Sequence, residues 1–592
     1  MLSLDQLIAG GQVRAAAWSP DGMQIAFVWQ REGVSRLWTV DAAGGFPRLV
    51  SPHEILMDTP ADAPSWRPDG KSLLYLSSAG GSPNLWSVPT DGGQPHRLTK
   101  GPGKESAPTW SPDGRHIAFL TDRDGFDQLA LIPVAADGSA AGWPRPLTTM
   151  AMDCREPQWS PDGSTIAFIG LEGLDSSALF LLNLESGELR AVRTSEPAFF
   201  SSPAWAPDGR RLVCINDSTG FAHLWLVDAL SAQAFPVPMD DSAEKGSPSW
   251  SPDGRDIVYT FNRNGYIGVG LWHQGEHVEL VPPTGVALQP QFSPDGKRLL
   301  FVCHDSRQAP DIYVQEETGE RRQVSFSGPP GILPEQLVEP TLVEYLAEDG
   351  LTIPAFLYKP VPAAAGRSPM IIYPHGGPTS QHTAGWYPFI QFFVAKGYGV
   401  LAPNFRGSTG YGRAFELANR GEWGKLDLSD VIRGAEFARS LDWVDPDRVG
   451  IWGGSYGGYL ALLALSKSPG TFRCGVDFYG VSNRFTSWRD TDRIGRRNIE
   501  RKLGRPTEDP ALYRAASPLV FEANIREPLL IMHGENDTRV PFGQSVEIVE
   551  ALRRRGFPVE FHAYPEEGHG FLKPKHLRDI YTKVEQFFAL YL

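Results

Sequence analysis

A short turn motif recurs along the first half of this chain and limits that half to a small set of repeat folds. Seven segments share the form aromatic-x-Pro-Asp-Gly, and successive copies begin 42 to 49 residues apart. They are WSPDG from Trp18, WRPDG from Trp66, WSPDG from Trp110, WSPDG from Trp159, WAPDG from Trp205, WSPDG from Trp250 and FSPDG from Phe292. Proline presets φ, aspartate bonds the nearby backbone and glycine accepts a positive φ, so each copy predicts a tight turn.

Apolar runs such as MQIAFVW, TIAFIG and RLLFVC follow these turns, and second runs such as RLWTVD and HLWLVD come next. Each unit is therefore predicted to form about four short strands, which is the size of one propeller blade. We expect residues 1–326 to form a seven-bladed β-propeller with the tryptophans packed between blades. A stacked solenoid is the alternative, but the blade-sized period without helices favours radial closure.

The pattern changes after a segment rich in glycine and proline at residues 327–337, which we interpret as a linker. In residues 338–592, short apolar runs such as PMIIYPH, GVLAPN and EPLLIMHG alternate with helix-like segments. Such alternation indicates an α/β domain whose mostly parallel sheet is covered on both faces. The chain is thus expected to combine a propeller with a second, α/β domain.

The sequence GGSYG at residues 453–457 lies between a strand-like run, RVGIW, and a helix-like run, YLALLAL. A G-x-S-x-G element in that context is typical of a nucleophile elbow, which exposes its serine on a sharp turn. Ser455 is therefore the candidate nucleophile. The alternative is a purely structural role, in which the glycines only form a tight connection between a strand and a helix.

An α/β-hydrolase domain needs an acid and then a histidine after the serine, each in a loop that follows a strand. Asp537 follows the run LLIMHG and His569 follows VEFHAY, so both are predicted to complete a triad with Ser455. Asp537 is preferred to Glu535 because it lies deeper in its loop. His569 is preferred to His562 because His562 falls within the strand-like run.

Two backbone N–H groups are needed to stabilise the oxyanion that forms during acyl transfer. We expect one from Tyr456, which follows the nucleophile, and the other from Gly377 in the segment YPHGGPTS. His375 precedes the serine in the chain and is assigned a structural role.

The formal net charge of −14 argues against a nucleic-acid partner and against general attraction to anionic membranes. The four cysteines show no paired spacing, so they indicate neither a metal site nor a disulfide framework. No signal peptide and no transmembrane segment are recognised, so a cytoplasmic location is expected. No metal or cofactor is predicted, and we allow for a homo-oligomer.

Five motifs together resemble the prolyl oligopeptidase family of serine peptidases, with its acylaminoacyl peptidase and dipeptidyl peptidase-like branch. They are HGGP from His375, NFRGSTGYG from Asn404, GGSYGGY from Gly453, HGENDTRVP from His533 and EEGHGF from Glu566. The resemblance implies hydrolysis of short peptides through an acyl-enzyme, beneath a propeller that restricts access. It favours an exopeptidase of acylaminoacyl-peptidase type.

Members that remove dipeptides hold the substrate's amine with a glutamate pair from the propeller, and no such pair is recognised here. Arginines after Phe478 instead offer forks for a substrate carboxylate, which would make the enzyme a carboxypeptidase; the candidates are Arg489, Arg493, Arg496 and Arg497. Alternatively, these arginines have a structural role on a solvated helix face or in a subunit contact. A dipeptidyl aminopeptidase, an esterase and a non-catalytic propeller binding protein are the remaining alternatives.

Overall fold

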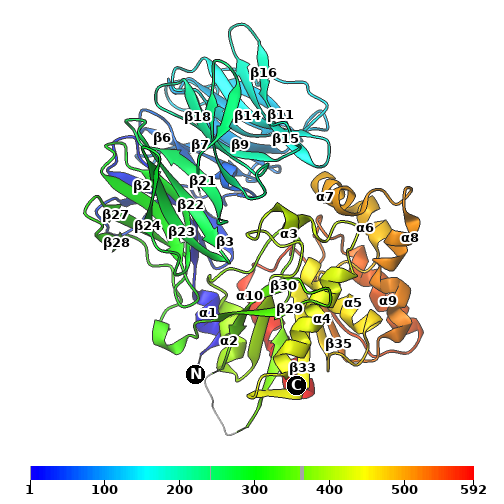
Figure 1. Ribbon diagram of the computed structural model, residues 1–592. Coiled ribbons are helices and arrows are strands. Elements are labelled where there is room, and N and C mark those ends of the chain that lie inside the picture. The colour runs from blue at the N-terminus through cyan, green and yellow to red at the C-terminus, as the bar shows by residue number, and fades with distance from the viewer. Residues whose placement is uncertain (1, 240–241, 361–365) are drawn as a thin grey trace. The chain divides into compact units, whose positions relative to one another are not determined.

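The computed structural model describes residues 2–239, 242–360 and 366–592, and the chain divides into two compact units (Figure 1). The first, here called the propeller unit, comprises Gly11–Asp305 and Ala309–Gly328. The second, here called the hydrolase unit, comprises Met1–Gly10, Ser306–Gln308 and Pro329–Leu592.

The propeller unit is built from antiparallel groups of four strands. Within its described residues, five groups form separate sheets, and two further groups join into one eight-stranded sheet. The strands of the first four groups are β1 (Gln12–Trp18), β2 (Gln24–Arg31), β3 (Val34–Asp41), β4 (Arg48–Leu49), β5 (Ser65–Trp66), β6 (Ser72–Ser77), β7 (Asn84–Pro89), β8 (His96–Arg97), β9 (Glu105–Trp110), β10 (His116–Thr121), β11 (Gln128–Pro133), β12 (Arg145–Pro146), β13 (Cys154–Trp159), β14 (Thr165–Glu172), β15 (Ser176–Asn183) and β16 (Leu189–Val192). The strands of the last three are β17 (Phe200–Trp205), β18 (Arg211–Asn216), β19 (His223–Asp228), β20 (Gln233–Pro236), β21 (Glu244–Trp250), β22 (Asp256–Arg263), β23 (Tyr266–His273), β24 (Glu276–Val281), β25 (Val286–Phe292), β26 (Arg298–His304), β27 (Asp311–Glu316) and β28 (Arg321–Gln323).

The repeated motif forms the turn between the first and second strands of each group. In the fourth group, the hydroxyl of Ser160 and the N–H of Ser164 both donate to Asp162, at 2.6 and 3.0 Å. Gly163 closes the turn with a φ of +73°, which a residue with a side chain rarely adopts. Proline, aspartate and glycine therefore play the parts that the sequence predicts.

The tryptophans of the motif connect neighbouring blades, as predicted. The indole N–H of Trp205 donates to the carbonyl of Gln158 at 3.2 Å, and that of Trp250 donates to Ala204 at 3.2 Å. Each bond crosses from one blade to the blade before it. The repeat period is thus converted into a repeated contact between blades.

The first and last blades meet, which closes the ring. The indole N–H of Trp18 donates to the carbonyl of Gln291 at 3.4 Å, and the Gln291 amide donates back to Ala16 at 2.8 Å. Arg298 of the last blade donates to the carbonyl of Gly22 at 2.9 Å. A stacked solenoid would leave its ends apart, so the predicted seven-bladed propeller is confirmed.

The hydrolase unit is centred on an eight-stranded sheet with the order β29-β30-β32-β31-β33-β34-β35-β36. Its strands are β29 (Thr341–Leu346), β30 (Thr352–Tyr358), β31 (Ser368–Ile372), β32 (Gly399–Pro403), β33 (Val444–Gly454), β34 (Gly475–Phe478), β35 (Leu529–Gly534) and β36 (Glu560–Tyr564). The hairpin β29–β30 pairs antiparallel with β32, and the strands from β32 to β36 run parallel. The predicted mostly parallel sheet is therefore confirmed.

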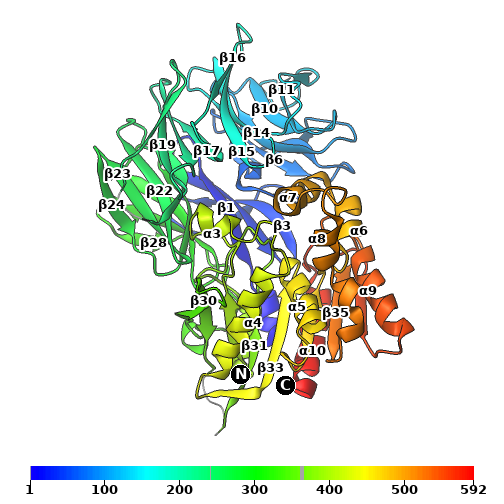
Figure 2. The same ribbon diagram turned by 45° about the vertical axis from the view of Figure 1, so that its right-hand side comes forward.

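Helices cover both faces of this sheet. The helices of the hydrolase unit are α1 (Leu4–Ala9), α2 (Pro388–Ala395), α3 (Arg413–Leu417), α4 (Leu426–Arg439), α5 (Tyr456–Lys467), α6 (Arg484–Asp490), α7 (Arg493–Leu503), α8 (Pro510–Ala515), α9 (Gly543–Arg554) and α10 (Pro574–Tyr591). Short 3-10 turns lie at η2 (Pro334–Gln336) and η3 (Pro518–Asn524) in the same unit and at η1 (Pro60–Asp62) in the propeller unit. Figure 2 shows α4 and α5 beside β33, and both helices contact that strand. Among the described residues, no helix is long and apolar enough to cross a membrane.

Helix α1 lies in the hydrolase unit although it precedes the first blade. It packs on α2 and α10, and Arg578 of α10 donates to Asp5 at 2.6 Å. The expected propeller boundary at residue 1 therefore differs from the structure, which begins the propeller unit at Gly11.

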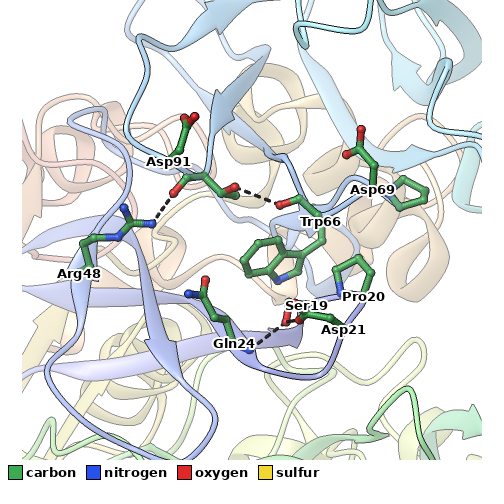
Figure 3. A pocket seen from close by; sticks show the side chains of 11 residues that line it. Ser19, Pro20, Asp21, Gln24, Arg48, Trp66, Asp69 and Asp91 are labelled. Atoms are coloured by element: carbon green, nitrogen blue, oxygen red, sulfur yellow. Dashed lines mark hydrogen bonds between the residues drawn. The ribbon is translucent and has the colours of Figure 1, made fainter.

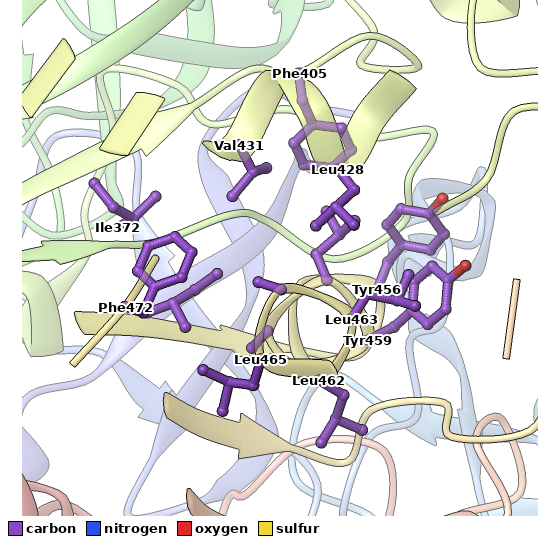
Figure 4. Packing of buried hydrophobic residues seen from close by; sticks show 14 of the residues in the cluster. Ile372, Phe405, Leu428, Val431, Tyr456, Tyr459, Leu462, Leu463, Leu465 and Phe472 are labelled. Carbon is purple, nitrogen blue, oxygen red and sulfur yellow. The ribbon is translucent and has the colours of Figure 1, made fainter. Parts of the chain in front are cut away.

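Alternation along each strand separates two apolar layers. Ile372, Ile451 and Ile531 belong to the core that also holds α4, α5 and α9, part of which Figure 4 shows. Trp452, one residue along from Ile451, instead contacts the rings of Phe393 on α2 and Tyr581 on α10. Because successive side chains of a strand point to opposite faces of the sheet, neighbouring residues of one strand belong to different layers.

We predict that the bonds between blades contribute measurably to stability. Trp250→Phe removes the indole N–H that bonds Ala204, and it also weakens the contact with Arg211. Trp225 is a matched control, because both residues are 8% exposed and the buried Trp225 N–H has no hydrogen-bond partner among the described residues. Trp250→Phe should lower the free energy of unfolding by about 1 kcal/mol more than Trp225→Phe. Equal losses in urea unfolding of the propeller would contradict this prediction.

Candidate active site

Ser455 occupies a strained turn between strand β33 and helix α5. Its φ of +56° and ψ of −116° are rarely adopted by a residue with a side chain. The flanking glycines are required by crowding, because a Cβ on Gly453 would lie 2.3 Å from Gly457. A Cβ on Gly457 would lie 2.1 Å from the carbonyl oxygen of Pro374. The two explanations of these glycines therefore coincide: they make a tight connection, and that connection presents the serine.

Ser455, His569 and Asp537 form one hydrogen-bonded series. The Oγ of Ser455 lies 3.0 Å from Nε2 of His569. The other ring nitrogen, Nδ1, lies 2.7 Å from Oδ2 of Asp537. With Asp537 ionised, Nδ1 carries the proton and Nε2 is left to accept from the serine hydroxyl.

Asp537 is held as an anion by donors that surround it. Its Oδ1 accepts the N–H groups of Arg539 and Val540, both at 2.9 Å. Burial alone would raise the pKa of Asp537, but hydrogen bonds from His533 and His569 outweigh it and lower the pKa to about 2. The carboxylate therefore stays ionised at neutral pH and can fix the tautomer of His569.

The loop after β31 brings Gly376 and Gly377 to the serine. A Cβ on Gly376 would lie 3.3 Å from the Cβ of Ser455, so this backbone passes directly beside the nucleophile. His375 Nδ1 donates to the carbonyl of Gly376 at 2.7 Å. In a trans peptide the C=O and the next N–H point in opposite directions, so this bond turns the Gly377 N–H away from His375.

His375 itself is engaged inside the protein. Burial lowers its pKa to about 4, so the ring is neutral. Its Nε2 lies 2.8 Å from the Oγ of Ser408, and its ring stacks on Phe405 with the ring centroids 4.4 Å apart. These contacts suit the structural role that was expected.

Two side chains near His569 in the sequence, Glu567 and His562, have partners outside the series. Glu567 accepts the N–H groups of Leu572 and Lys573 at 3.1 and 3.0 Å and so closes the loop that holds His569. His562 lies 2.7 Å from Glu560. Neither side chain contributes to the series that ends at Ser455.

Two aromatic or imidazole groups beside the triad were not predicted. Tyr479 has a φ of +42°, and its ring centroid lies 5.0 Å from that of His569. His533 packs against Asp537, with 3.3 Å between its Nε2 and Oδ2 of the carboxylate. Both residues stand at the carboxyl end of a parallel strand, and this position was the signal that could have identified them.

The four candidate arginines lie on α6 and α7. Arg489 pairs with Asp490 through two bonds of 2.6 Å. Arg496 donates to the carbonyls of Trp488 and Arg489 at 3.0 and 2.8 Å, so binding a substrate there would require these bonds to break. Arg493 begins α7, and Arg497 lies one turn further along.

A separate pocket of about 660 Å³ lies in the propeller unit, among side chains of the first two blades (Figure 3). Arg48, Trp66 and Asp91 are among its lining residues, none of which belongs to the unit that holds Ser455. The described residues contain no group of three or more histidine, cysteine or acidic side chains placed to hold a metal ion.

Comparison with known families identifies the two parts of the chain. Residues 387–592 match the model of the prolyl oligopeptidase family, and residues 8–140 and 134–270 match that of the TolB beta propeller domain. The C-terminal part of the chain is a prolyl oligopeptidase family domain. The resemblance drawn from the sequence motifs is thereby confirmed.

Curated relatives match part of this chain. Dipeptidyl aminopeptidase BIII of Pseudoxanthomonas mexicana is 32% identical over 327 residues, which are 53% of this chain and 47% of the relative. The human acylamino-acid-releasing enzyme is 32% identical over 229 residues, which are 37% of this chain and 31% of the relative. The matched region thus spans less than half of the length of these relatives.

Solved structures resemble the whole chain in fold. A Mycobacterium tuberculosis puromycin-hydrolyzing peptidase aligns with a TM-score of 0.90 over 100% of this chain and 96% of that chain, at 20% identity. The Pyrococcus horikoshii acylaminoacyl peptidase aligns with a TM-score of 0.79 over 99% of this chain and 97% of that chain, at 19% identity. The predicted combination of a propeller with an α/β-hydrolase domain is therefore confirmed.

The contact between His569 and Asp537 predicts a large effect of one carboxylate. Asp537→Asn should lower kcat on an activated ester by about 10⁴-fold, because the imidazole loses the partner that fixes its tautomer. Glu535→Gln is the matched control, since Glu535 is an exposed acid in the same loop. A similar loss in both variants, or none in Asp537→Asn, would contradict the assignment of Asp537.

Proposed function

We propose that this protein is a serine peptidase that hydrolyses short peptides through an acyl-enzyme. The observation that carries the proposal is the hydrogen-bonded series from Ser455 through His569 to Asp537, built on a strained turn. Strain of this kind costs roughly 1–3 kcal/mol per residue, and it is concentrated at functional sites.

Acylation begins with attack by the Oγ of Ser455 on the substrate carbonyl carbon. Nε2 of His569, 3.0 Å away, accepts the hydroxyl proton and then donates it to the leaving amine. Asp537 stabilises the imidazolium that forms in between. Water then attacks the acyl-enzyme with His569 again as base, which frees the acid product and restores Ser455.

The oxyanion is stabilised by the backbone N–H groups of Tyr456 and Gly377. Tyr456 is the first residue of α5, and the N–H groups of a helix's first turn have no partner within the helix. The His375 bond to the Gly376 carbonyl supports Gly377 as the second donor, because it sets the direction of that N–H. Together the two groups stabilise negative charge that exists only after attack.

Within peptidases, we propose an exopeptidase of acylaminoacyl-peptidase type. The names of the curated relatives support this class, since they include acylamino-acid-releasing enzymes as well as dipeptidyl peptidases. We also propose that the propeller restricts the substrates to short peptides. An esterase with the same triad is distinguished from a peptidase by comparing the turnover of blocked amino-acid p-nitroanilides with that of p-nitrophenyl esters.

One peptide offered in four forms tests which terminus is recognised. The forms are free, N-acetylated, C-amidated and blocked at both ends, with products identified by mass spectrometry. We predict release of the acetylated N-terminal residue from both acetylated forms, with little cleavage of the free and C-amidated forms. Removal of a dipeptide from the free N-terminus would contradict the acylaminoacyl assignment and favour a dipeptidyl aminopeptidase.

Release of a C-terminal residue only from peptides with a free carboxylate would instead favour a carboxypeptidase. In that case Arg493→Ala and Arg497→Ala should raise KM for those peptides while KM for C-amidated peptides stays unchanged. Unchanged KM in both variants would exclude these two arginines as carboxylate ligands. No cleavage of any form would contradict the proposed peptidase function.

A further inference from the structure

The side chain of Tyr456, the residue after Ser455, is held by burial, by one hydrogen bond and by ring contacts. It is 3% exposed, and its hydroxyl donates to Oδ2 of Asp427 on α4. Its ring centroid lies 5.0 Å from each of the rings of Trp423 and Tyr459. Figure 4 shows the Tyr456 and Tyr459 rings side by side at helix α5.

Asp427 is equally constrained. Its side chain is fully buried, and Oδ1 accepts the N–H groups of Gly424 at 2.7 Å and Leu428 at 2.8 Å. Burial raises the pKa of Asp427 to about 6, against the hydrogen bonds from Tyr456 and Gly424, which lower it. At pH 8 it is therefore a carboxylate held from three directions.

A buried cation lies against the same aromatic rings. The guanidinium carbon of Arg484 lies 3.7 Å from the ring centroid of Tyr459, 4.6 Å from that of Trp423 and 5.5 Å from that of Tyr456. Arg484 is 2% exposed, and its Nε and Nη2 have no hydrogen-bond partner among the described residues. Its charge is thus held by aromatic faces close to Tyr456.

The position of Tyr456 gives this arrangement a consequence for catalysis. The peptide between Ser455 and Tyr456 carries the N–H that the proposed mechanism assigns to the oxyanion. On one side, the N–H of Ser455 donates to the carbonyl of Phe478 at 2.9 Å. On the other side, the Tyr456 side chain is bonded to Asp427, so this strained peptide is fixed at both ends.

An apolar pair, phenylalanine at position 456 with an apolar residue at position 427, would fill the same surroundings without burying a carboxylate. Burying an ionised group is costly unless its hydrogen bonds are satisfied, and an apolar replacement is often equally stable. The phenol–carboxylate bond is therefore not needed to bury apolar surface. Its effect is to set where the Tyr456 backbone lies relative to Ser455.

We propose that Asp427 is a positioning residue, which acts through the Tyr456 phenol to hold the Tyr456 backbone N–H on the oxyanion. The proposal rests on the proposed serine-hydrolase function, and it adds to it a residue on a different helix. Asp427 does not touch the substrate, so its effect should pass entirely through Tyr456.

A double-mutant cycle at pH 8 tests this proposal. Tyr456→Phe removes only the hydroxyl, and Asp427→Asn removes the negative charge. The readouts are kcat and KM on a p-nitrophenyl ester and the rate constant for phosphonylation of Ser455 by a fluorophosphonate, in which fluoride leaves. Removal of an oxyanion donor costs about 10²–10³-fold in kcat, so displacement of one should cost about 10-fold.

We expect each single variant to lose about 10-fold in kcat and in phosphonylation rate, with KM within about 2-fold of wild type. The double variant should lose no more than a single variant, since both changes break one interaction. Tyr459→Phe is the matched control, because the buried Tyr459 hydroxyl has no hydrogen-bond partner among the described residues, and its kcat should be unchanged. Thermal unfolding checks that each variant is folded.

The outcomes separate this proposal from the proposed function. If the fluorophosphonate phosphonylates wild type and the Tyr456→Phe variant at the same rate, the positioning role is overturned while the hydrolase function stands. Multiplying losses in the double variant would also overturn it, since Asp427 would then act by another route. A wild-type protein that the fluorophosphonate does not phosphonylate would overturn both.

Discussion

The strained backbone of Ser455 is the constraint on which the hydrolase unit depends. A φ of +56° persists only because neighbouring segments leave no alternative. The carbonyl of Phe478 in β34 holds the serine N–H, the loop at Pro374 excludes a side chain at Gly457, and Asp427 of α4 anchors Tyr456. The turn that exposes Ser455 is thus maintained by a strand, a loop and a helix from separate parts of the sequence.

The parallel sheet brings the other members of the proposed triad to this turn. Strands β33, β34, β35 and β36 are neighbours in order, so their carboxyl ends lie along one edge. Ser455, Tyr479, Asp537 and His569 follow these four strands in turn. Strands β34 and β35 separate β33 from β36, so the loop after β36 must carry His569 back across this edge to lie 3.0 Å from Ser455, 114 residues earlier in the chain.

The parts of this arrangement that local chemistry determines could be predicted from the sequence. Proline, aspartate and glycine at fixed offsets predict the blade turns, and the flanking glycines and strand–loop contexts predict Ser455, Asp537 and His569. The contact between Asp427 and Tyr456 could not be predicted, because it depends on how α4 packs against α5. The same holds for Arg496, whose helix position was expected but whose bonds to the carbonyls of α6 require the angle between two helices. The attachment of α1 to α2 and α10 likewise follows from packing that no repeat or motif announces.

The central claim is that the fold makes one serine nucleophilic by holding it against His569. Reaction with diisopropyl fluorophosphate, followed by peptide mapping with mass spectrometry, measures this claim directly. The account predicts a single phosphorylated residue, Ser455, with the modification lost when His569 is replaced by alanine. An unmodified protein would contradict the account, as would modification of another serine such as Ser408, which already bonds His375.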